Sequence, residues 1–206
     1  VKRSKAILYE ARKRRVWPGR DDKILASWNG LMVRGIAEAA RAFGNARYRQ
    51  AAIESATFLF ERLVQDGRVF RSYKDGRARI AGYLEDHASL GLAAMSVYEL
   101  TFDEVWLARS RQMGDAVVRW FWDDEAGAFY DTSSDHEQLI IRPREISDNA
   151  TPSGTSLAVE LLIRLAELFA DADARRRATY VVESLAPAIG RYPSAFGHML
   201  GCADML

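Results

Sequence analysis

Neighbouring carboxylate or amide side chains occur at three places in the chain, each just before an apolar helical stripe. These pairs are Asp21 with Asp22, Glu85 with Asp86, and Asp148 with Asn149. Two carboxyl groups near each other can act as general acid and general base on a sugar, and their separation sets the stereochemical outcome. Because all three pairs stand at helix starts in a helical chain, we expect them to share one rim of the molecule.

The four acidic residues Asp21, Asp22, Glu85 and Asp86 are the predicted catalytic groups. The alternative is that they cap helices, because carboxylate oxygens accept hydrogen bonds from the free N–H groups of a first helical turn. A cap requires one acid and each place supplies two. The sequence therefore leaves both roles open.

Further residues near these helix starts are suited to contact a sugar. Trp28 offers an aromatic face for the C–H surface of a sugar ring, or packs between helices. Asn29 supplies both a donor and an acceptor, or completes a turn. Arg142 and Arg144 suit an anionic group such as a uronate or phosphate, or are solvated strand residues. The predicted substrate-binding residues are Trp28, Asn29, Tyr83, His87, Arg142, Asp148, Asn149 and Ser153.

The chain contains three histidines, His87, His136 and His198, at scattered positions. Their spacing from acidic residues is not that of a metal site, and the glycines do not form a phosphate-binding loop. A lone histidine such as His87 is more often structural than catalytic. We therefore expect no metal and no cofactor.

Composition excludes several classes of protein. The 206 residues are 49% hydrophobic, enough for one large domain or two small ones, and the formal net charge of +1 gives no reason to expect nucleic-acid binding. The single cysteine, Cys202, rules out an internal disulfide. No apolar run approaches the ~20 residues of a membrane span, and the first residues are charged. We expect a soluble cytoplasmic protein with neither nucleic acid nor membrane as partner.

Apolar residues recur at helical spacing along most of the chain. The predicted helices cover residues 3–15, 28–43, 46–63, 84–100, 104–121, a segment after Pro152, 174–189, and a final segment within 195–206. Asp21 or Asp22 is the expected cap of the second helix. A hairpin is predicted over 68–81 around Asp75–Gly76, and a second strand-rich insert over 128–147. Such helix pairs bury their faces against neighbouring pairs, in an open superhelix or a closed ring.

Several motifs together resemble a known family. They are residues 21–32 (DDKILASWNGLM), 83–86 (YLED), 141–143 (IRP), 150–154 (ATPSG) and 191–193 (RYP). The set resembles the spermatogenesis-associated protein 20/YyaL group, which pairs a thioredoxin-like domain of unknown function 255 with an α/α-toroid. Two departures are His87, where we expect Tyr, and Thr155, where we expect Asn.

The resemblance implies a ring similar to six-hairpin glycosidases and N-acylglucosamine 2-epimerases, with a cleft at one end. We therefore expect an all-α fold of helical hairpins forming part of an (α/α)6 toroid, with short β-hairpin inserts. Residues 1–206 would be one partial toroid domain, without the thioredoxin-like domain and the first part of the ring.

The implied function is carbohydrate processing or binding, by glycoside hydrolase-like or sugar epimerase/isomerase-like chemistry. The expected ligand is a small sugar or sugar derivative. The alternative is a non-catalytic interaction or scaffold domain of a thioredoxin-like redox protein. A partial ring exposes apolar helical edges, so we predict self-association or contact with the missing half of the toroid.

Overall fold

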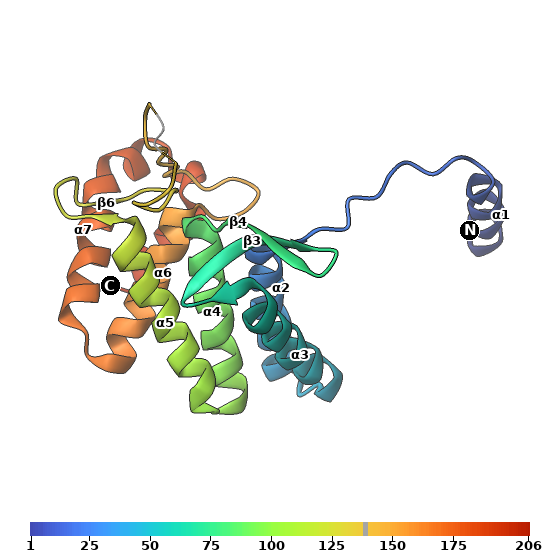
Figure 1. Ribbon diagram of the computed structural model, residues 1–206, viewed down its shortest axis with the longest axis horizontal. Coiled ribbons are helices and arrows are strands. Elements are labelled where there is room, and N and C mark those ends of the chain that lie inside the picture. The colour runs from blue at the N-terminus through green and yellow to red at the C-terminus, as the bar shows by residue number, and fades with distance from the viewer. Residues whose placement is uncertain (138–139) are drawn as a thin grey trace.

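The computed structural model describes residues 1–137 and 140–206, which form a helical body with short β inserts (Figure 1). Its helices are α1 Lys2–Lys13, α2 Ala26–Phe43, α3 Ala46–Leu63, α4 Leu84–Thr101, α5 Glu104–Phe121, α6 Gly154–Phe169, α7 Ala172–Arg191 and α8 Gly197–Asp204, with the 3-10 turn η1 at Pro193–Ala195. The helices predicted from apolar spacing are confirmed, with boundaries that differ by a few residues. The all-α prediction is therefore correct.

Three tight turns make helical hairpins of α2–α3, α4–α5 and α6–α7. In each turn the first helix ends in a residue with left-handed backbone, and the next residue caps the second helix with a side-chain oxygen. The left-handed residues are Gly44, Phe102 and Ala170, and the caps that follow are Asn45, Asp103 and Asp171. The repeated local chemistry explains why the chain reverses after each first helix.

The hairpins stack into two layers (Figure 1). Helices α2, α4, α6 and α8 pack side by side, each against the next, while α3, α5 and α7 each pack against the first helix of their own hairpin. Helix α4 lies in the middle, and every residue from Asp86 to Val97 is buried. The largest fully buried side chains include Leu84, Leu90, Met95, Met113, Phe121, Phe129, Leu157 and Leu161.

The starts of the first-layer helices lie at one rim. The Ser27 amide of α2 donates to Asp86 Oδ1 of α4 over 3.1 Å, and the His198 amide of α8 donates to Asp148 Oδ2 over 2.8 Å. The starts of α4 and α6 are so close that a Cβ on Gly154 would lie 3.1 Å from the Glu85 amide nitrogen. The array therefore brings together segments that are far apart in sequence.

The β insert between α3 and α4 is a small antiparallel sheet beside this rim. Strands β3 Arg68–Lys74 and β4 Arg77–Ala81 form the predicted hairpin, while β1 Ile24–Leu25 and β2 Val64–Gln65 also pair with β3. The turn residues Asp75 and Gly76 have φ of 51° and 76°. Positive φ at both positions matches the right-handed twist of the strands and explains the Asp-Gly sequence.

The predicted second strand-rich insert is wrong beyond its first residues. Strand β6 Ala128–Phe129 pairs with β5 Trp122–Asp123, and the described residues from 130 to 153 contain no further strand; Leu139, part of the predicted strand, lies outside them. Isolated hydrogen bonds from side chains hold this segment in place of a β-ladder. Arg142 Nη2 donates to the carbonyl oxygens of Thr132 and Trp120, at 2.7 and 3.2 Å.

The predicted cap of the second helix is also wrong. Helix α2 begins at Ala26, and its N-cap residue Leu25 makes no side-chain cap. Pairing of residues 24–25 with β3 holds Asp21 and Asp22 upstream of the helix start. Asp86, from α4, instead accepts the hydrogen bond of an amide in the first turn.

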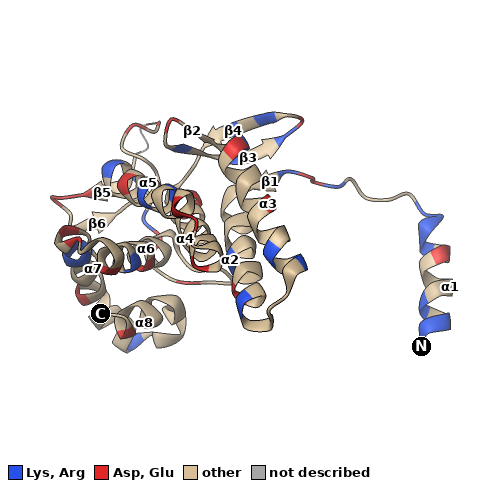
Figure 2. Ribbon diagram, turned by 90° about the horizontal axis from the view of Figure 1, so that it is seen from below, with Lys and Arg blue, Asp and Glu red and all other residues tan. Residues whose placement is uncertain are grey.

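Helix α1 confirms the predicted N-terminal helix but lies apart from the body (Figures 1 and 2). None of its residues is buried, and Ile7 and Leu8 of its apolar stripe are 61% and 70% exposed. Within the described ranges, every helix is too short or too polar to cross a lipid bilayer.

Candidate functional site

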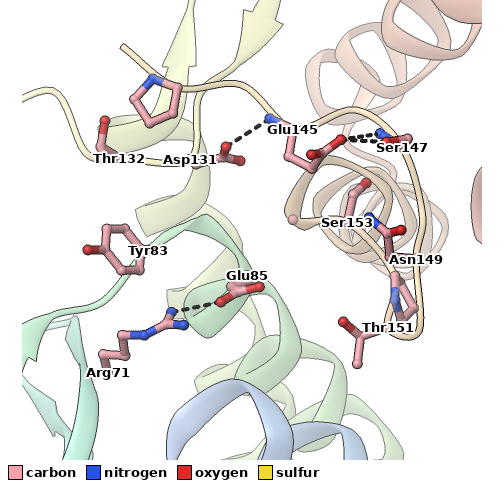
Figure 3. Close-up of a pocket in the computed structure, with 13 residues that line it drawn as sticks. Arg71, Tyr83, Glu85, Asp131, Thr132, Glu145, Ser147, Asn149, Thr151 and Ser153 are labelled. Carbon is pink, nitrogen blue, oxygen red and sulfur yellow. Dashed lines mark hydrogen bonds and ion pairs between the residues drawn. The ribbon is translucent and has the colours of Figure 1, made fainter. Parts of the chain in front are cut away.

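A cavity of about 450 Å³ lies at the rim, between the starts of α4 and α6 (Figure 3). Strand β3, the residues after β6 and the loop before α6 complete its walls. The lining residues are Arg71, Tyr83, Glu85, Asp131, Thr132, Pro143, Glu145, Ser147, Asn149, Thr151, Pro152, Ser153 and Gly154. Its volume and its mixture of apolar and polar walls suit a small organic ligand.

One wall of the cavity carries an ion pair between the sheet and α4. Arg71 Nη1, from β3, donates to Glu85 Oε1 over 2.7 Å and to Asp86 Oδ2 over 3.3 Å. The Arg71 guanidinium also lies over the Tyr83 ring, 4.8 Å from its centroid. Burial disfavours the charge of Arg71, but the carboxylates outweigh burial and raise its pKa. Arg71 is therefore a fixed cation that orients Glu85.

The opposite wall presents Asp131. Its main chain is fixed on both sides, because its carbonyl oxygen accepts from the Leu84 amide over 2.9 Å and its amide donates to the Pro143 carbonyl over 3.0 Å. Burial raises the pKa of Asp131, and the negative charges of Glu145 and Glu85 raise it further. The Asp131 carboxyl group thus holds its proton more strongly than an exposed aspartate does.

Glu145 is a third carboxylate at the cavity, and its pKa moves in the other direction. It accepts hydrogen bonds from the Ser147 hydroxyl over 2.5 Å and the Ser147 amide over 3.0 Å, and these lower its pKa. The Glu145 amide donates to Asp131 Oδ2 over 2.8 Å. The opposite pKa shifts of these two nearby carboxyl groups favour the protonated form of Asp131 and the negatively charged form of Glu145.

The third wall is the loop that leads into α6. Ser153 is the N-cap of that helix, and its hydroxyl oxygen accepts from the Ser156 amide over 3.1 Å. Asp148 fixes the loop, because Oδ1 accepts from the Ser153 amide over 2.9 Å while Oδ2 caps α8. Asn149 and Thr151 then project polar groups at the cavity (Figure 3).

Four of the residues predicted from sequence line this cavity: Tyr83, Glu85, Asn149 and Ser153. Asp148 lies behind the lining and holds the loop to α8. Arg142, predicted to bind an anion, instead holds backbone carbonyl oxygens within the loop, and its guanidinium lies over the Tyr130 ring.

Asp86 and His87 are fully buried behind the Tyr83–Glu85 wall. Asp86 Oδ2 accepts from the Tyr83 amide over 3.0 Å. His87 Nε2 accepts from the Val69 amide over 3.1 Å, and its Nδ1 lies 3.0 Å from the Tyr83 carbonyl oxygen. Burial lowers the pKa of His87 to about 4. Both side chains therefore support the wall from behind.

The segment 21–29 lies outside the cavity lining. Asp22 pairs with Lys74 across 2.6 Å, and Asp21 pairs with Lys23 across 3.3 Å. Trp28 is 65% exposed on α2, and the Asn29 side chain donates to the Leu25 carbonyl over 2.7 Å. The structure thus brings the polar residues at the starts of α4 and α6 together at one cavity. The polar residues before α2 lie outside its lining.

Arg71, Asp131 and Glu145 are the charged cavity residues that were not predicted from the sequence. Arg71 occupies one of several basic positions in the β insert, and Asp131 and Glu145 lie in segments without periodicity. The weak signal was the Asp-Thr pair at the end of the predicted strand segment 128–132.

Comparison with solved structures defines the fold as part of an α/α-toroid. A Bacteroides thetaiotaomicron alpha-mannanase superposes with a TM-score of 0.63 at 15% identity, covering 80% of this chain and 45% of that chain. Cellobiose 2-epimerase from Spirochaeta thermophila gives a TM-score of 0.63 at 16% identity, over 79% and 43%. Unsaturated glucuronyl hydrolase from Bacillus sp. GL1 gives 0.60 at 17% identity, over 82% and 49%.

Sequence comparison confirms the resemblance to spermatogenesis-associated protein 20. The human protein of that name is 28% identical over 204 residues, covering 94% of this chain and 26% of its own length. An uncharacterized protein of Caenorhabditis elegans is 26% identical over 207 residues, covering 97% and 28%. The chain spans about a quarter of the length of these curated relatives. No family model matches it.

Proposed function

We propose that the rim cavity binds a carbohydrate and processes it by acid/base chemistry of its carboxyl groups. The observation that carries this proposal is the meeting of Glu85, Asp131 and Glu145 around one cavity (Figure 3), with the pKa of Asp131 raised and that of Glu145 lowered. In this scheme Asp131 is the general acid, since burial and neighbouring charge help it keep a proton. Glu85, fixed by Arg71, is the base or the group that stabilises positive charge on the sugar.

The remaining walls suit a sugar. Tyr83 supplies an aromatic surface for C–H groups, and its ring is held by the guanidinium above it. Asn149, Thr151 and Ser153 supply amide and hydroxyl groups that can pair with sugar hydroxyls. The resemblance to toroids named for mannanase, cellobiose epimerase and glucuronyl hydrolase activity supports this class of ligand.

The proposal is tested by replacing the acid and leaving the cavity's shape intact. Asp131→Asn is expected to retain saccharide binding and to lose about 10²–10⁴-fold in turnover, the usual contribution of one general acid. Asp66→Asn is the matched control, because Asp66 is an exposed turn residue outside the cavity, with φ of 50° that Asn tolerates. Binding and turnover would be measured over neutral mono- and disaccharides.

Two results would count against this function. Full turnover by Asp131→Asn would remove the proposed acid from the mechanism. Binding without turnover of any saccharide, in both the parent chain and the control, would leave a carbohydrate-binding domain without the chemistry.

An interaction role is the second candidate, and the surface of α2 favours it. Trp28, Met32 and Phe43 on this helix are 65%, 62% and 76% exposed. The chain matches 45% of the mannanase, and further hairpins of a ring would pack beside such an edge. We propose that this edge contacts another part of a toroid, either a second copy or a longer chain.

Light scattering tests self-association. The double variant Trp28→Ser with Met32→Ser is expected to abolish a dimer, and a monomer at high concentration would contradict self-association.

A further inference from the structure

We propose that the rim cavity selects its sugar by charge, preferring a sugar that carries a protonated amine, accepting a neutral one and rejecting uronates and sugar phosphates. This inference rests on the proposed carbohydrate function and names the substrate class. It is carried by the arrangement of charged side chains at the cavity.

The cavity lining contains three carboxyl groups and one guanidinium, namely Glu85, Asp131, Glu145 and Arg71. The single cation is already engaged, because Arg71 contacts Glu85 at 2.7 Å and the buried Asp86 at 3.3 Å. Both contacts use Nη1, so an anion that approached Nη2 or Nε would meet a guanidinium whose charge two carboxylates already offset. Arg71 is therefore a weak anchor for an anion.

Two nearby arginines outside the lining, Arg142 and Arg68, are also engaged. Arg142 donates to carbonyl oxygens of the loop, and Arg68 pairs with Asp135 through two contacts of 2.9 Å. Arg144 lies outside the lining, and its attraction for Asp131 ranks behind burial and the repulsion of two glutamates. Neither Arg142 nor Arg68 therefore offers the open guanidinium fork that binds a uronate or phosphate.

Asp131 and Glu145 are the other two carboxyl groups of the lining, and among the described residues neither forms an ion pair. Asp131 accepts the Glu145 amide, and Glu145 accepts the Ser147 amide and hydroxyl; both sets of partners are neutral. The negative charges of Glu145 and Glu85 act together on Asp131. A protonated amine placed beside Glu145 would be attracted by these negative charges even while Asp131 keeps its proton, whereas an anion would be repelled by them.

The experiment compares sugars that differ in charge and little else. Glucosamine, glucose, N-acetylglucosamine and glucuronic acid would be titrated into the protein by calorimetry at about pH 6, in low salt and in high salt. Glucosamine is expected to bind at least about tenfold more tightly than glucose, and glucuronic acid at least about tenfold more weakly. N-acetylglucosamine keeps the C2 substituent without the charge and is expected to behave as a neutral sugar. High salt reduces these ratios.

Two variants test whether the cavity causes the preference for the protonated amine. Glu145→Gln removes one carboxylate and is expected to bring the glucosamine-to-glucose ratio close to one. Glu167→Gln removes an exposed charge of α6 outside the cavity and is expected to leave the ratio unchanged.

Glucuronic acid binding as tightly as glucose, or an amine preference that survives Glu145→Gln, would overturn the inference. Turnover of a neutral sugar that is lost in Asp131→Asn, without any effect of ligand charge on binding, would overturn the inference while the proposed function stands. No binding by any of the four sugars would overturn the inference, and no binding across the wider panel of neutral mono- and disaccharides would overturn the proposed function.

Discussion

Neutralising Glu160 is expected to destabilise the array at neutral pH and to have a smaller effect in acid. Glu160 lies on α6 with its side chain 6% exposed. Arg34 of α2 donates to both of its carboxylate oxygens, at 2.7 and 2.6 Å, and His198 Nε2 of α8 lies 2.8 Å from Oε2. This one carboxylate therefore joins three first-layer helices.

The expected loss in the free energy of unfolding follows from the pKa of Glu160. Burial alone would raise it, but the hydrogen bonds and charges of His198 and Arg34 outweigh burial and lower it from 4.5 to about 2. At about 1.4 kcal/mol for each pKa unit, the ionised carboxylate contributes on the order of 3 kcal/mol to the free energy of unfolding. The Arg34 and His198 side chains are only 27% and 24% exposed. Water therefore replaces little of their contact with Glu160 once its charge is removed.

The sign of the pH dependence is fixed by the lowered pKa. The unfolded chain binds the proton first, so the contribution is fully present above pH 4.5 and is lost as pH falls through about 2. Urea denaturation of Glu160→Gln should show a loss of about 3 kcal/mol at pH 7, and less than half of that near pH 3. Glu167→Gln on the same helix is the control: its side chain is 63% exposed in a pair with Arg175, and removal should cost below about 1 kcal/mol. Equal losses in the two variants, or a Glu160→Gln loss that does not change with pH, would refute the assignment.

Two further predictions concern the packing behind the cavity. Gly30→Ala should cost about 1–3 kcal/mol, because its Cβ would lie 3.0 Å from the Ser89 main chain of α4. Gly35→Ala on the same helix should instead stabilise by about 0.5–1 kcal/mol, since nothing lies within 4 Å of its Cβ; equal effects in thermal unfolding would contradict this close approach. His87 is held neutral with a pKa of about 4 against 6.5 in the unfolded chain, so stability should fall as pH drops from 6.5 through 4. His87→Gln should flatten that part of the unfolding profile, and an unchanged slope would exclude His87 as its source.

The helices were predictable because their signals are local. Apolar spacing marks each helix, and Gly44–Asn45 marks the first reversal, whereas Phe102 and Ala170 at the later reversals are not residue types that indicate left-handed backbone. The hairpin at Asp75–Gly76 was equally clear, because its backbone requires positive φ. The toroid itself came from motif resemblance, since periodicity alone left the open superhelix and the ring as equal alternatives.

The site was predictable only where a helix start forms part of its wall, as at Glu85 and Ser153. Asp131 and Glu145 take their places through contacts with residues distant in sequence or in irregular segments, such as the Leu84 amide on the Asp131 carbonyl. Asp86 shows the same limit, because a local pattern indicates the cap of its own helix but not its bond to Ser27, 59 positions away. Long-range pairing of residues 24–25 with β3 likewise displaced the expected cap.

The most direct test of the carbohydrate cavity is an NMR titration of the protein with a neutral saccharide from the panel. We expect the amide shifts to cluster at Tyr83, Glu85, Thr132 and Asn149, which surround the cavity in Figure 3. Shifts centred on the exposed Trp28 indole, or no shifts at any residue, would contradict the assignment of the rim cavity as the sugar site.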